Sequence, residues 1–207
     1  MDKPRGEHHG AFHHIYNHAV DEIDLFLSDA DRELLFATLA KSVARYGIII
    51  HAIVLMSNHV HILIETPTPD MGAFMQHFKS CFTKAFNRIH GRKGALFREK
   101  YKNEPIESEE QLKEVLRYIH NNPVKAGIVS RPEDFKWSSM SAYLGRTERP
   151  RWLTVDRLLD LLQGCENLQR FTANLSPKTA WDPDEPRRTR YSESFIAKYL
   201  QRPPRPT

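Results

Sequence analysis

The part of the sequence that decides the fold is the stretch of residues 48–65, which reads IIIHAIVLMSNHVHILIE. Residues 48–56 form an apolar run rich in β-branched side chains, which is typical of a strand buried on both faces. Residues 57–58, Ser and Asn, break this run, and residues 59–65 predict a second strand. The stretch therefore predicts two consecutive strands joined by a tight turn.

Upstream of this stretch, residues 13–20 are compatible with a first strand. Leu34, Leu35, Leu39 and Val43 then recur at helical spacing and predict a helix over residues 30–45, capped by Ser28 or Asp29 and ended by Gly47. Downstream, Phe74, Phe78, Phe82 and Phe86 follow one another at four-residue steps and predict a helix over residues 71–90 with an aromatic inner stripe.

The chain continues with a predicted fourth strand over residues 97–106. Ser108 is a typical N-cap for the next helix, whose buried face comprises Leu112, Val115, Leu116 and Ile119. We expect this helix to close at Asn122–Pro123, because a residue before proline is pushed away from helical geometry.

The order strand, helix, strand, strand, helix, strand, helix predicts an α+β fold of the ferredoxin-like, split βαβ type. In this fold, helices lie on one face of a largely antiparallel sheet. The composition shifts after Gly145, so residues 1–145 are expected to form one domain and residues 146–207 a helical, proline- and arginine-rich extension. In that extension we expect a helix around Val155–Leu162, a linker over 177–190 and a short helix over 191–200.

The 207 residues are 40% apolar and 27% charged, which is the composition of a soluble globular protein. The longest apolar run is much shorter than the ~20 residues that cross a bilayer, and the N-terminus has no apolar leader segment. We therefore expect a cytoplasmic protein. The two cysteines, Cys81 and Cys165, indicate neither a disulfide framework nor a cysteine zinc site.

Positive charge is concentrated in one part of the chain, although the net charge is only +4. Residues 71–105 contain eight Lys or Arg and only two Glu. Such an excess suits a polyanionic partner, and a solvated helix face is the alternative. The candidates for phosphate contacts are Arg88, Arg92, Lys93, Arg98, Lys100 and Lys102.

His59 and His61 are two residues apart on a predicted strand, so both side chains leave the same face. Two imidazoles on one face can share a metal ion, but further oxygen ligands must complete its shell. A structural role for both histidines is the alternative. The N-terminal histidines, His8, His9, His13, His14 and His18, are spaced too irregularly to favour a second metal site.

Tyr118 and Asn122 are four residues apart on the helix that follows the fourth strand. Their directions differ by about 40°, which places both at the edge of the buried stripe. A tyrosine hydroxyl can act as a nucleophile, or the ring can simply pack. Tyr101 is a competing nucleophile, but it lies between Lys100 and Lys102 on a predicted strand, so a contact to the polyanionic partner or a core position is favoured.

Several motifs together resemble the single-tyrosine HUH transposases, and within them the REP-associated tyrosine transposases. The motifs are Met56–Ile64, Leu96–Lys102, Arg117–Gly127, Trp137–Ser139 and Ala142–Gly145. The resemblance spans residues 10–145. It departs from the family pattern at Ser57, where many relatives have proline, and at Asn122, which directly precedes a proline.

The resemblance implies a metal-dependent HUH endonuclease that cleaves single-stranded DNA and transfers the strand at hairpin, REP-like sequences. It implies that Tyr118 is the nucleophile, forming a 5′-phosphotyrosine link, and that His59, His61 and Asn122 bind Mg or Mn. A homodimer is a further possibility, because relatives work as dimers. Two alternatives stay open: a DNA-binding regulator of the same fold that does not cut, and a metal-dependent phosphodiesterase that uses water.

Overall fold

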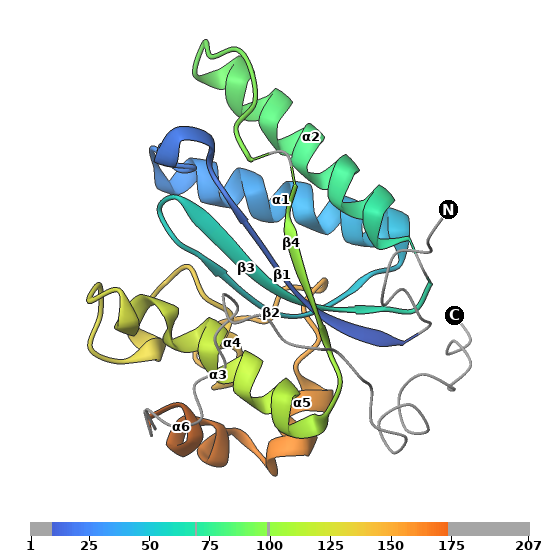
Figure 1. The fold of residues 1–207 in the computed structure, drawn as a ribbon. Coiled ribbons are helices and arrows are strands. Elements are labelled where there is room, and N and C mark those ends of the chain that lie inside the picture. Colours follow the sequence, from blue (N-terminus) through green and yellow to red (C-terminus); the bar gives the residue numbers. More distant parts are fainter. Residues whose placement is uncertain (1–9, 69, 99, 174–207) are drawn as a thin grey trace.

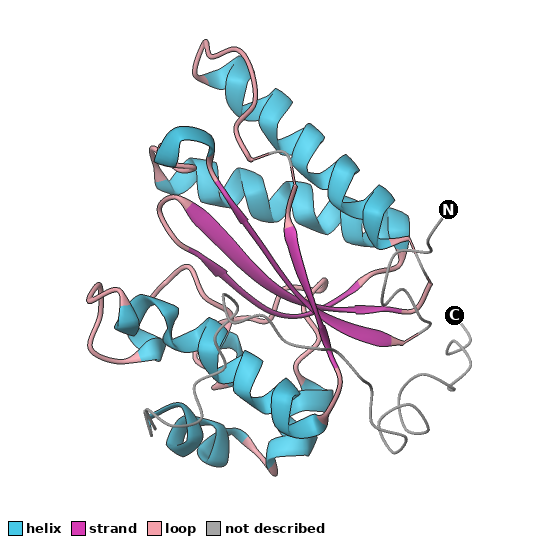
Figure 2. Ribbon diagram, in the orientation of Figure 1, coloured by secondary structure: helices cyan, strands magenta, loops and turns pink. Residues whose placement is uncertain are grey.

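A four-stranded antiparallel sheet forms the centre of the protein (Figures 1 and 2). The computed structural model describes residues 10–68, 70–98 and 100–173. The strands are β1 (Ala11–His18), β2 (Ile49–Leu55), β3 (His59–Thr66) and β4 (Lys102–Ile106). They lie side by side in the order β2-β3-β1-β4. The predicted pair of strands within residues 48–65 is confirmed as the hairpin of β2 and β3.

Helices cover both faces of this sheet. Helices α1 (Asp29–Tyr46) and α2 (Met71–Ile89) lie on one face, and α3 (Glu109–Lys125) lies on the other (Figure 1). The order β1-α1-β2-β3-α2-β4 confirms the ferredoxin-like, split βαβ fold. The expectation of helices on one face holds for α1 and α2, but α3 covers the opposite face. The near-continuous apolar strands of the hairpin explain this, because they need cover on both sides.

The C-terminal part of the described chain continues the layer of α3. It contains the turn η2 (Pro132–Asp134) and helices α4 (Met140–Tyr143), α5 (Asp156–Leu162) and α6 (Cys165–Ala173). Asn121 of α3 donates a hydrogen bond to the carbonyl oxygen of Thr172 in α6, 2.9 Å away. The predicted segments over 177–190 and 191–200 lie outside the described residues.

The predicted helix signals are confirmed at the ends and along the buried faces. Ser28 forms a capping box with Asp31 at the start of α1, and Ser108 accepts a hydrogen bond from the backbone of Gln111. Gly47 ends α1 with a φ of 64°, in the left-handed region that favours glycine. The four phenylalanines of the α2 stripe, Phe74, Phe78, Phe82 and Phe86, are all buried.

The first and last residues of two strands differ from the prediction. Strand β1 begins and ends two residues earlier than expected, because Val20 starts the short turn η1 (Val20–Glu22). The predicted strand over 97–106 is reduced to β4 and one isolated bridge, between Phe97 and Ala19. Between these two places, the side chain of Asn17 donates a hydrogen bond to the Lys100 carbonyl oxygen at 3.1 Å, which replaces ladder pairing.

The outer edge of β2 is paired with segments from later in the chain. The backbone N–H of Leu55 donates to the Trp137 carbonyl oxygen, at 2.9 Å, and the N–H of Thr154 donates to the Ile50 carbonyl oxygen, at 2.8 Å. Residues 137–139 and 153–154 thus use hydrogen-bonding groups that an edge strand would otherwise expose.

None of the helices within the described ranges is both long enough and apolar enough to cross a bilayer.

Candidate active site

His59 and His61 are held by β3 on the face that α3 covers. Residues Val60 and Ile62 alternate with them and are buried on the other face. The register with β1 places Tyr16 opposite His61 and His18 opposite His59. The predicted common direction of the two histidines is confirmed, and their rings lie 5.0 Å apart, almost perpendicular to each other.

Helix α3 supplies Tyr118 and Asn122 to the same place. The prediction that this helix closes at Asn122–Pro123 is wrong, because α3 continues through Pro123 to Lys125. The proline lies within the last turn, and the turn is still closed by bonds from the N–H of Ala126 to the Asn122 carbonyl oxygen and from Ile128 to that of Pro123. Asn122 therefore keeps its helical position one turn after Tyr118.

The side chain of Asn122 lies between the two histidines of β3. Its Oδ1 atom is 3.4 Å from His59 Nε2, and its Nδ2 atom is 3.2 Å from His61 Nε2. His59 Nδ1 is 2.7 Å from the side-chain oxygen of Asn58, which fixes the other side of that ring. The structure thus brings together the three side chains that the sequence resemblance gave as metal ligands.

Tyr118 lies directly beside this group. Its ring meets the ring of His61 edge-on, with centroids 5.3 Å apart, and the ring of His14 at 5.8 Å. The ammonium group of Lys125 lies 5.7 Å from the centre of the Tyr118 ring. A positive charge at this distance favours the approach of a phosphate to the tyrosine.

Strand β1 adds site residues that the sequence analysis missed. His14 Nε2 is 3.0 Å from His61 Nδ1, and the ring of His18 stacks on that of His59 at 4.9 Å. Tyr16 lies between them along the strand and stacks on His61 at 5.5 Å. The signal was the alternation of residues 14, 16 and 18, which places the three rings on one face of a strand.

Burial keeps the central imidazoles neutral. It lowers the pKa of His59 to about 4, with a smaller contribution from the positive charge of His18, and it lowers the pKa of His14 to about 3. It also holds the pKa of His61, which is only 3% exposed, well below the usual value. Neutral imidazoles keep the lone pair that a metal ion requires.

The proton positions of His59 fit a cation between this histidine and Asn122. A neutral ring has one N–H, and the short contact with the Asn58 oxygen assigns that N–H to Nδ1. The lone pair of His59 Nε2 then faces the Oδ1 atom of Asn122, and two acceptors without a proton between them repel. A divalent cation relieves this repulsion, and the set of two imidazoles and one amide oxygen suits Mg or Mn with water completing the shell.

A larger set of ligands is absent from the described residues. They contain no group of three or more His, Cys, Asp or Glu side chains that could hold a metal ion. The amide of Asn122 is the side chain that contacts both His59 and His61.

The six basic candidates for phosphate contacts lie along α2, the loop after it and β4. Arg88, Lys93, Arg98, Lys100 and Lys102 are exposed. Arg92 is half-buried and donates to the Ala95 carbonyl oxygen at 2.7 Å, so it also holds the loop. The ammonium group of Lys102 lies 5.4 Å from the centre of the Tyr16 ring, which stacks on His61.

Tyr101, the competing nucleophile, lies apart from the histidines. It is half-buried and lines a cavity against α2, on the face of the sheet opposite α3. This position agrees with the expected core or DNA-contact role.

Comparisons with known proteins concern the fold and the family of the chain. No curated protein matches the chain. Among solved structures, the chain is similar to a REP-associated tyrosine transposase bound to a REP hairpin, with a TM-score of 0.62 and 19% identity over 75% of this chain and 93% of that one. It also matches a putative transposase from Deinococcus radiodurans, with a TM-score of 0.42 and 21% identity over 58% of this chain and 97% of that one.

The sequence model of the family described as "Transposase IS200 like" matches residues 14–122. This range is more than half of the chain, and it extends from the first histidine of the site on β1 to the asparagine on α3. The chain therefore belongs to the IS200-like transposases.

Proposed function

We propose that this transposase cleaves single-stranded DNA next to a hairpin and transfers the cut strand through a covalent bond to Tyr118. The transposase of similar fold is bound to a REP hairpin. We extend that substrate class, imperfect REP-like hairpins with single-stranded flanks, to this chain. The observation that carries the proposal is the placement of Tyr118 against His61, within a group that also contains His59 and Asn122.

The reaction conserves the energy of the phosphodiester bond. The Tyr118 oxygen attacks the scissile phosphorus and loses its proton, the bond from phosphorus to the 3′ oxygen breaks, and a free 3′-hydroxyl end leaves. The 5′ end stays attached as a phosphotyrosine. A 3′-hydroxyl end then attacks the same phosphorus and displaces the tyrosine, so strands are rejoined without ATP.

Residues of this chain prepare the site for that step. His59, His61 and Asn122 would hold a divalent ion, Mg or Mn, which when bound polarises the scissile phosphate and stabilises the departing oxygen. The ammonium group of Lys125 lies over the Tyr118 ring and that of Lys102 over the Tyr16 ring, and both positive charges favour the binding of a phosphate. The exposed basic residues along α2 and β4 position the rest of the strand through its phosphates.

Covalent capture tests the proposal. Labelled single-stranded hairpin DNA from the flanks of the protein's own gene is incubated with Mg or Mn and analysed by denaturing electrophoresis. We expect a metal-dependent protein–DNA band, and we expect Tyr118→Phe to abolish it while hairpin affinity stays within about twofold. The matched control is Tyr101→Phe, which should keep the band.

The other outcomes identify the alternative functions. Hairpin binding without a covalent band on several flanking hairpins would indicate a regulator that does not cut. Free 5′-phosphate ends without attached protein, in the wild type and in Tyr118→Phe alike, would indicate a phosphodiesterase that uses water. Either result would overturn the proposed strand transfer.

A further inference from the structure

His120 of α3 is a fully buried side chain that the proposed reaction does not use. Its Nε2 atom is 2.9 Å from the hydroxyl oxygen of Ser139. The ring of Tyr143 meets its ring edge-on, with centroids 5.2 Å apart. Ser139 and Tyr143 belong to the sequence motifs Trp137–Ser139 and Ala142–Gly145, which also have no part in the proposed chemistry. The structure therefore brings three unexplained features of the sequence together at one place.

Both partners of His120 are themselves bound to the backbone of β2. The N–H of Ser139 donates to the Ile53 carbonyl oxygen at 2.9 Å, and the N–H of Ile53 donates to the Ser139 hydroxyl oxygen at 3.0 Å. The hydroxyl of Tyr143 donates to the His51 carbonyl oxygen at 2.8 Å. The position of the His120 ring is thus fixed relative to the sheet.

The surroundings of His120 determine which of its ring nitrogens carries the proton. Burial lowers the pKa of His120 to about 3, so the ring is neutral and has one N–H. Its Nδ1 atom is buried and has no hydrogen-bond partner among the described residues. A buried N–H without an acceptor is costly, so the proton is on Nε2 and is donated to Ser139. The Ser139 hydroxyl then accepts two hydrogen bonds and donates one, to the Ile53 carbonyl oxygen at 3.3 Å, which uses its full capacity.

His120 and the two site residues of α3 lie on opposite flanks of the side of the helix that faces the sheet (Figure 1). At ~100° per residue, His120 is about 160° away from Tyr118 and from Asn122 around the helix axis. Ile119, which is fully buried, lies between the two flanks. One flank therefore contacts the histidines of β3, and the other is bound to Ser139 beside β2. A rotation of α3 that carried Tyr118 away from the histidines would break the contact on the second flank.

We infer that the hydrogen bond between His120 and Ser139 fixes the rotation of α3 about its own axis and thereby positions Tyr118 for the reaction. The inference rests on the proposed function, and it deepens that function by naming two positioning residues that act through α3. Asn122 is on the same flank as Tyr118, so one contact holds both the nucleophile and the amide that lies between His59 and His61.

The rate of covalent capture at saturating hairpin DNA tests the effect on the reaction. His120→Phe keeps a ring beside Tyr143 but removes the N–H. We expect it to slow capture about tenfold because the nucleophile is misplaced, while hairpin affinity in fluorescence anisotropy changes less than about twofold. His120→Gln keeps an N–H donor at a similar reach and should regain most of the rate. Equal capture rates for wild type and His120→Phe overturn the inference.

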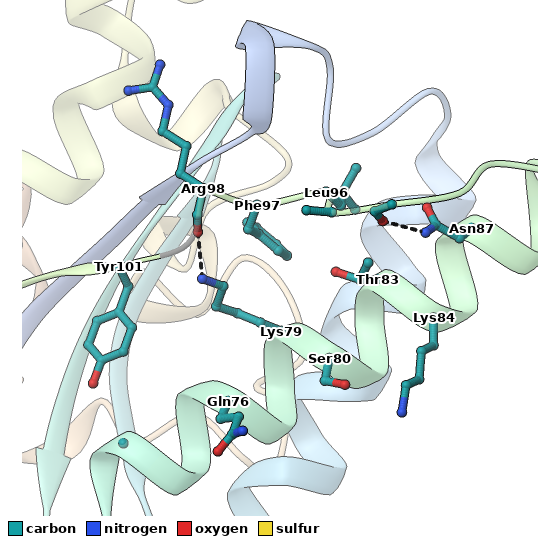
Figure 3. A pocket seen from close by; sticks show the side chains of 13 residues that line it. Gln76, Lys79, Ser80, Thr83, Lys84, Asn87, Leu96, Phe97, Arg98 and Tyr101 are labelled. Atoms are coloured by element: carbon teal, nitrogen blue, oxygen red, sulfur yellow. Dashed lines mark hydrogen bonds between the residues drawn. The ribbon is translucent and has the colours of Figure 1, made fainter.

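A double variant tests whether His120 and Ser139 act through one contact. Ser139→Ala should also slow capture, and adding His120→Phe to it should cause little further loss, because the contact is already absent. Losses that multiply would show two independent effects and overturn the inference. The matched control is Ser80→Ala, since the Ser80 side chain lines a cavity against α2 on the opposite face of the sheet from α3 (Figure 3). It should capture DNA at the wild-type rate.

The side-chain amide of Asn122 reports the position of α3 without metal or DNA. Its NMR resonance is assigned by its loss in Asn122→Ala. We expect this resonance to shift in His120→Phe and to return towards the wild-type position in His120→Gln. Asn121→Ala removes the neighbouring bond to Thr172 of α6 and should neither shift the resonance nor slow capture. Thermal unfolding shows that each variant is folded at the assay temperature. Equal effects of Asn121→Ala and His120→Phe would indicate general loosening of α3 and overturn the inference.

The two measurements separate this inference from the proposed function. If the wild type captures DNA and the His120 variants capture it at the same rate, strand transfer stands and the positioning role is wrong. If the Asn122 resonance shifts as expected but the wild type forms no covalent band, His120 positions α3 and the proposed reaction is wrong.

Discussion

The Nε2 atom of His14 lies 3.0 Å from the Nδ1 atom of His61, and the angle between the planes of the two imidazole rings is 9°. Because the Asn122 amide donates to His61 Nε2, the proton of the neutral His61 ring is on Nδ1 and is donated to His14. His14 thereby fixes which nitrogen of His61 carries the lone pair that faces the site. It is a positioning residue, since it acts through His61.

Loss of this contact is expected to weaken metal binding more than folding. His14→Phe removes the acceptor, and we expect Mn²⁺ affinity, measured by titration calorimetry, to fall about 10- to 100-fold. His14→Gln keeps an acceptor at this place and should recover part of the affinity. Equal affinities for wild type and His14→Phe would show that His14 only packs.

Two neighbouring asparagines on α3 provide a matched pair. Asn122 contacts both histidines, whereas Asn121 donates to the Thr172 carbonyl oxygen. We expect Asn122→Ala to reduce Mn²⁺ affinity and covalent capture with little loss of stability. Asn121→Ala should lower the free energy of unfolding by about 1–2 kcal/mol and leave Mn²⁺ affinity unchanged. The reverse pattern in calorimetry and chemical denaturation would contradict the assignment of Asn122.

The tyrosine and the histidines of one chain lie together, which predicts a site completed within a single chain. Tyr118 is 5.3 Å from His61 of the same chain, measured between ring centres. Mixing Tyr118→Phe with a variant that carries His59→Ala and His61→Ala should therefore restore no covalent band. A restored band would mean that a homodimer exchanges its tyrosines between subunits.

The basic residues on β4 and before it are expected to contact phosphates. For single strands, each lost phosphate contact reduces the slope of log affinity against log salt by about 0.7. Arg98→Gln and Lys100→Gln should each cause such a change in fluorescence anisotropy titrations. Lys41→Gln, at an exposed position of α1, is the control and should leave the slope unaltered. No change in slope for Arg98→Gln and Lys100→Gln would remove both from the interface.

Stability is expected to fall in acid because of Glu65. Burial tends to raise the pKa of its carboxyl, but hydrogen bonds and positive charge from His51 and Arg157 outweigh this and leave the pKa below its usual value. A depressed pKa in the folded state stabilises the protein above the unfolded pKa of about 4.5, and this stability is lost as the pH falls below it.

Denaturant unfolding at pH 7 and pH 3.5 tests whether the free energy of unfolding falls in acid as expected. Glu65→Gln should cost about 1.5–3 kcal/mol at pH 7, because a charged hydrogen bond is lost, and should make stability less dependent on pH in acid. Glu33→Gln, on the exposed side of α1, should change neither the stability at pH 7 nor its dependence on pH. A Glu65→Gln variant with the same pH dependence as the wild type would contradict the prediction.

The sequence allowed the sheet, its helices and the central site group to be predicted for physical reasons. Strand alternation placed His59 and His61 on one face, and helical spacing placed Tyr118 near Asn122. The bounds of β4 escaped prediction because the side chain of Asn17, distant in sequence, takes the place of ladder pairing. The end of α3 was also not predicted correctly. The rule that a residue before proline leaves helical geometry considers only neighbouring residues, whereas Pro123 is buried within a helix that packs on the sheet.

Alternation along the sequence places His14 and His18 on one face of a strand, but only the register of β1 with β3 brings that face to His59 and His61. Irregular spacing in the whole N-terminal histidine set concealed the two members that alternate on one face. His13, directly before His14, is on the other face of the strand, and its ring contacts the side-chain oxygen of Asn103 at 2.9 Å. His8 and His9 lie outside the described residues.

The pairing of residues 137–139 and 153–154 with β2 also limits how two copies of the chain can associate. A common way to form a dimer is to continue one sheet into the next through exposed edge strands. On the β2 side, the chain's own later segments already use the backbone groups that such a union needs. Two copies can therefore join through the opposite edge or through their helices, but a continuous sheet across β2 would first require these segments to detach.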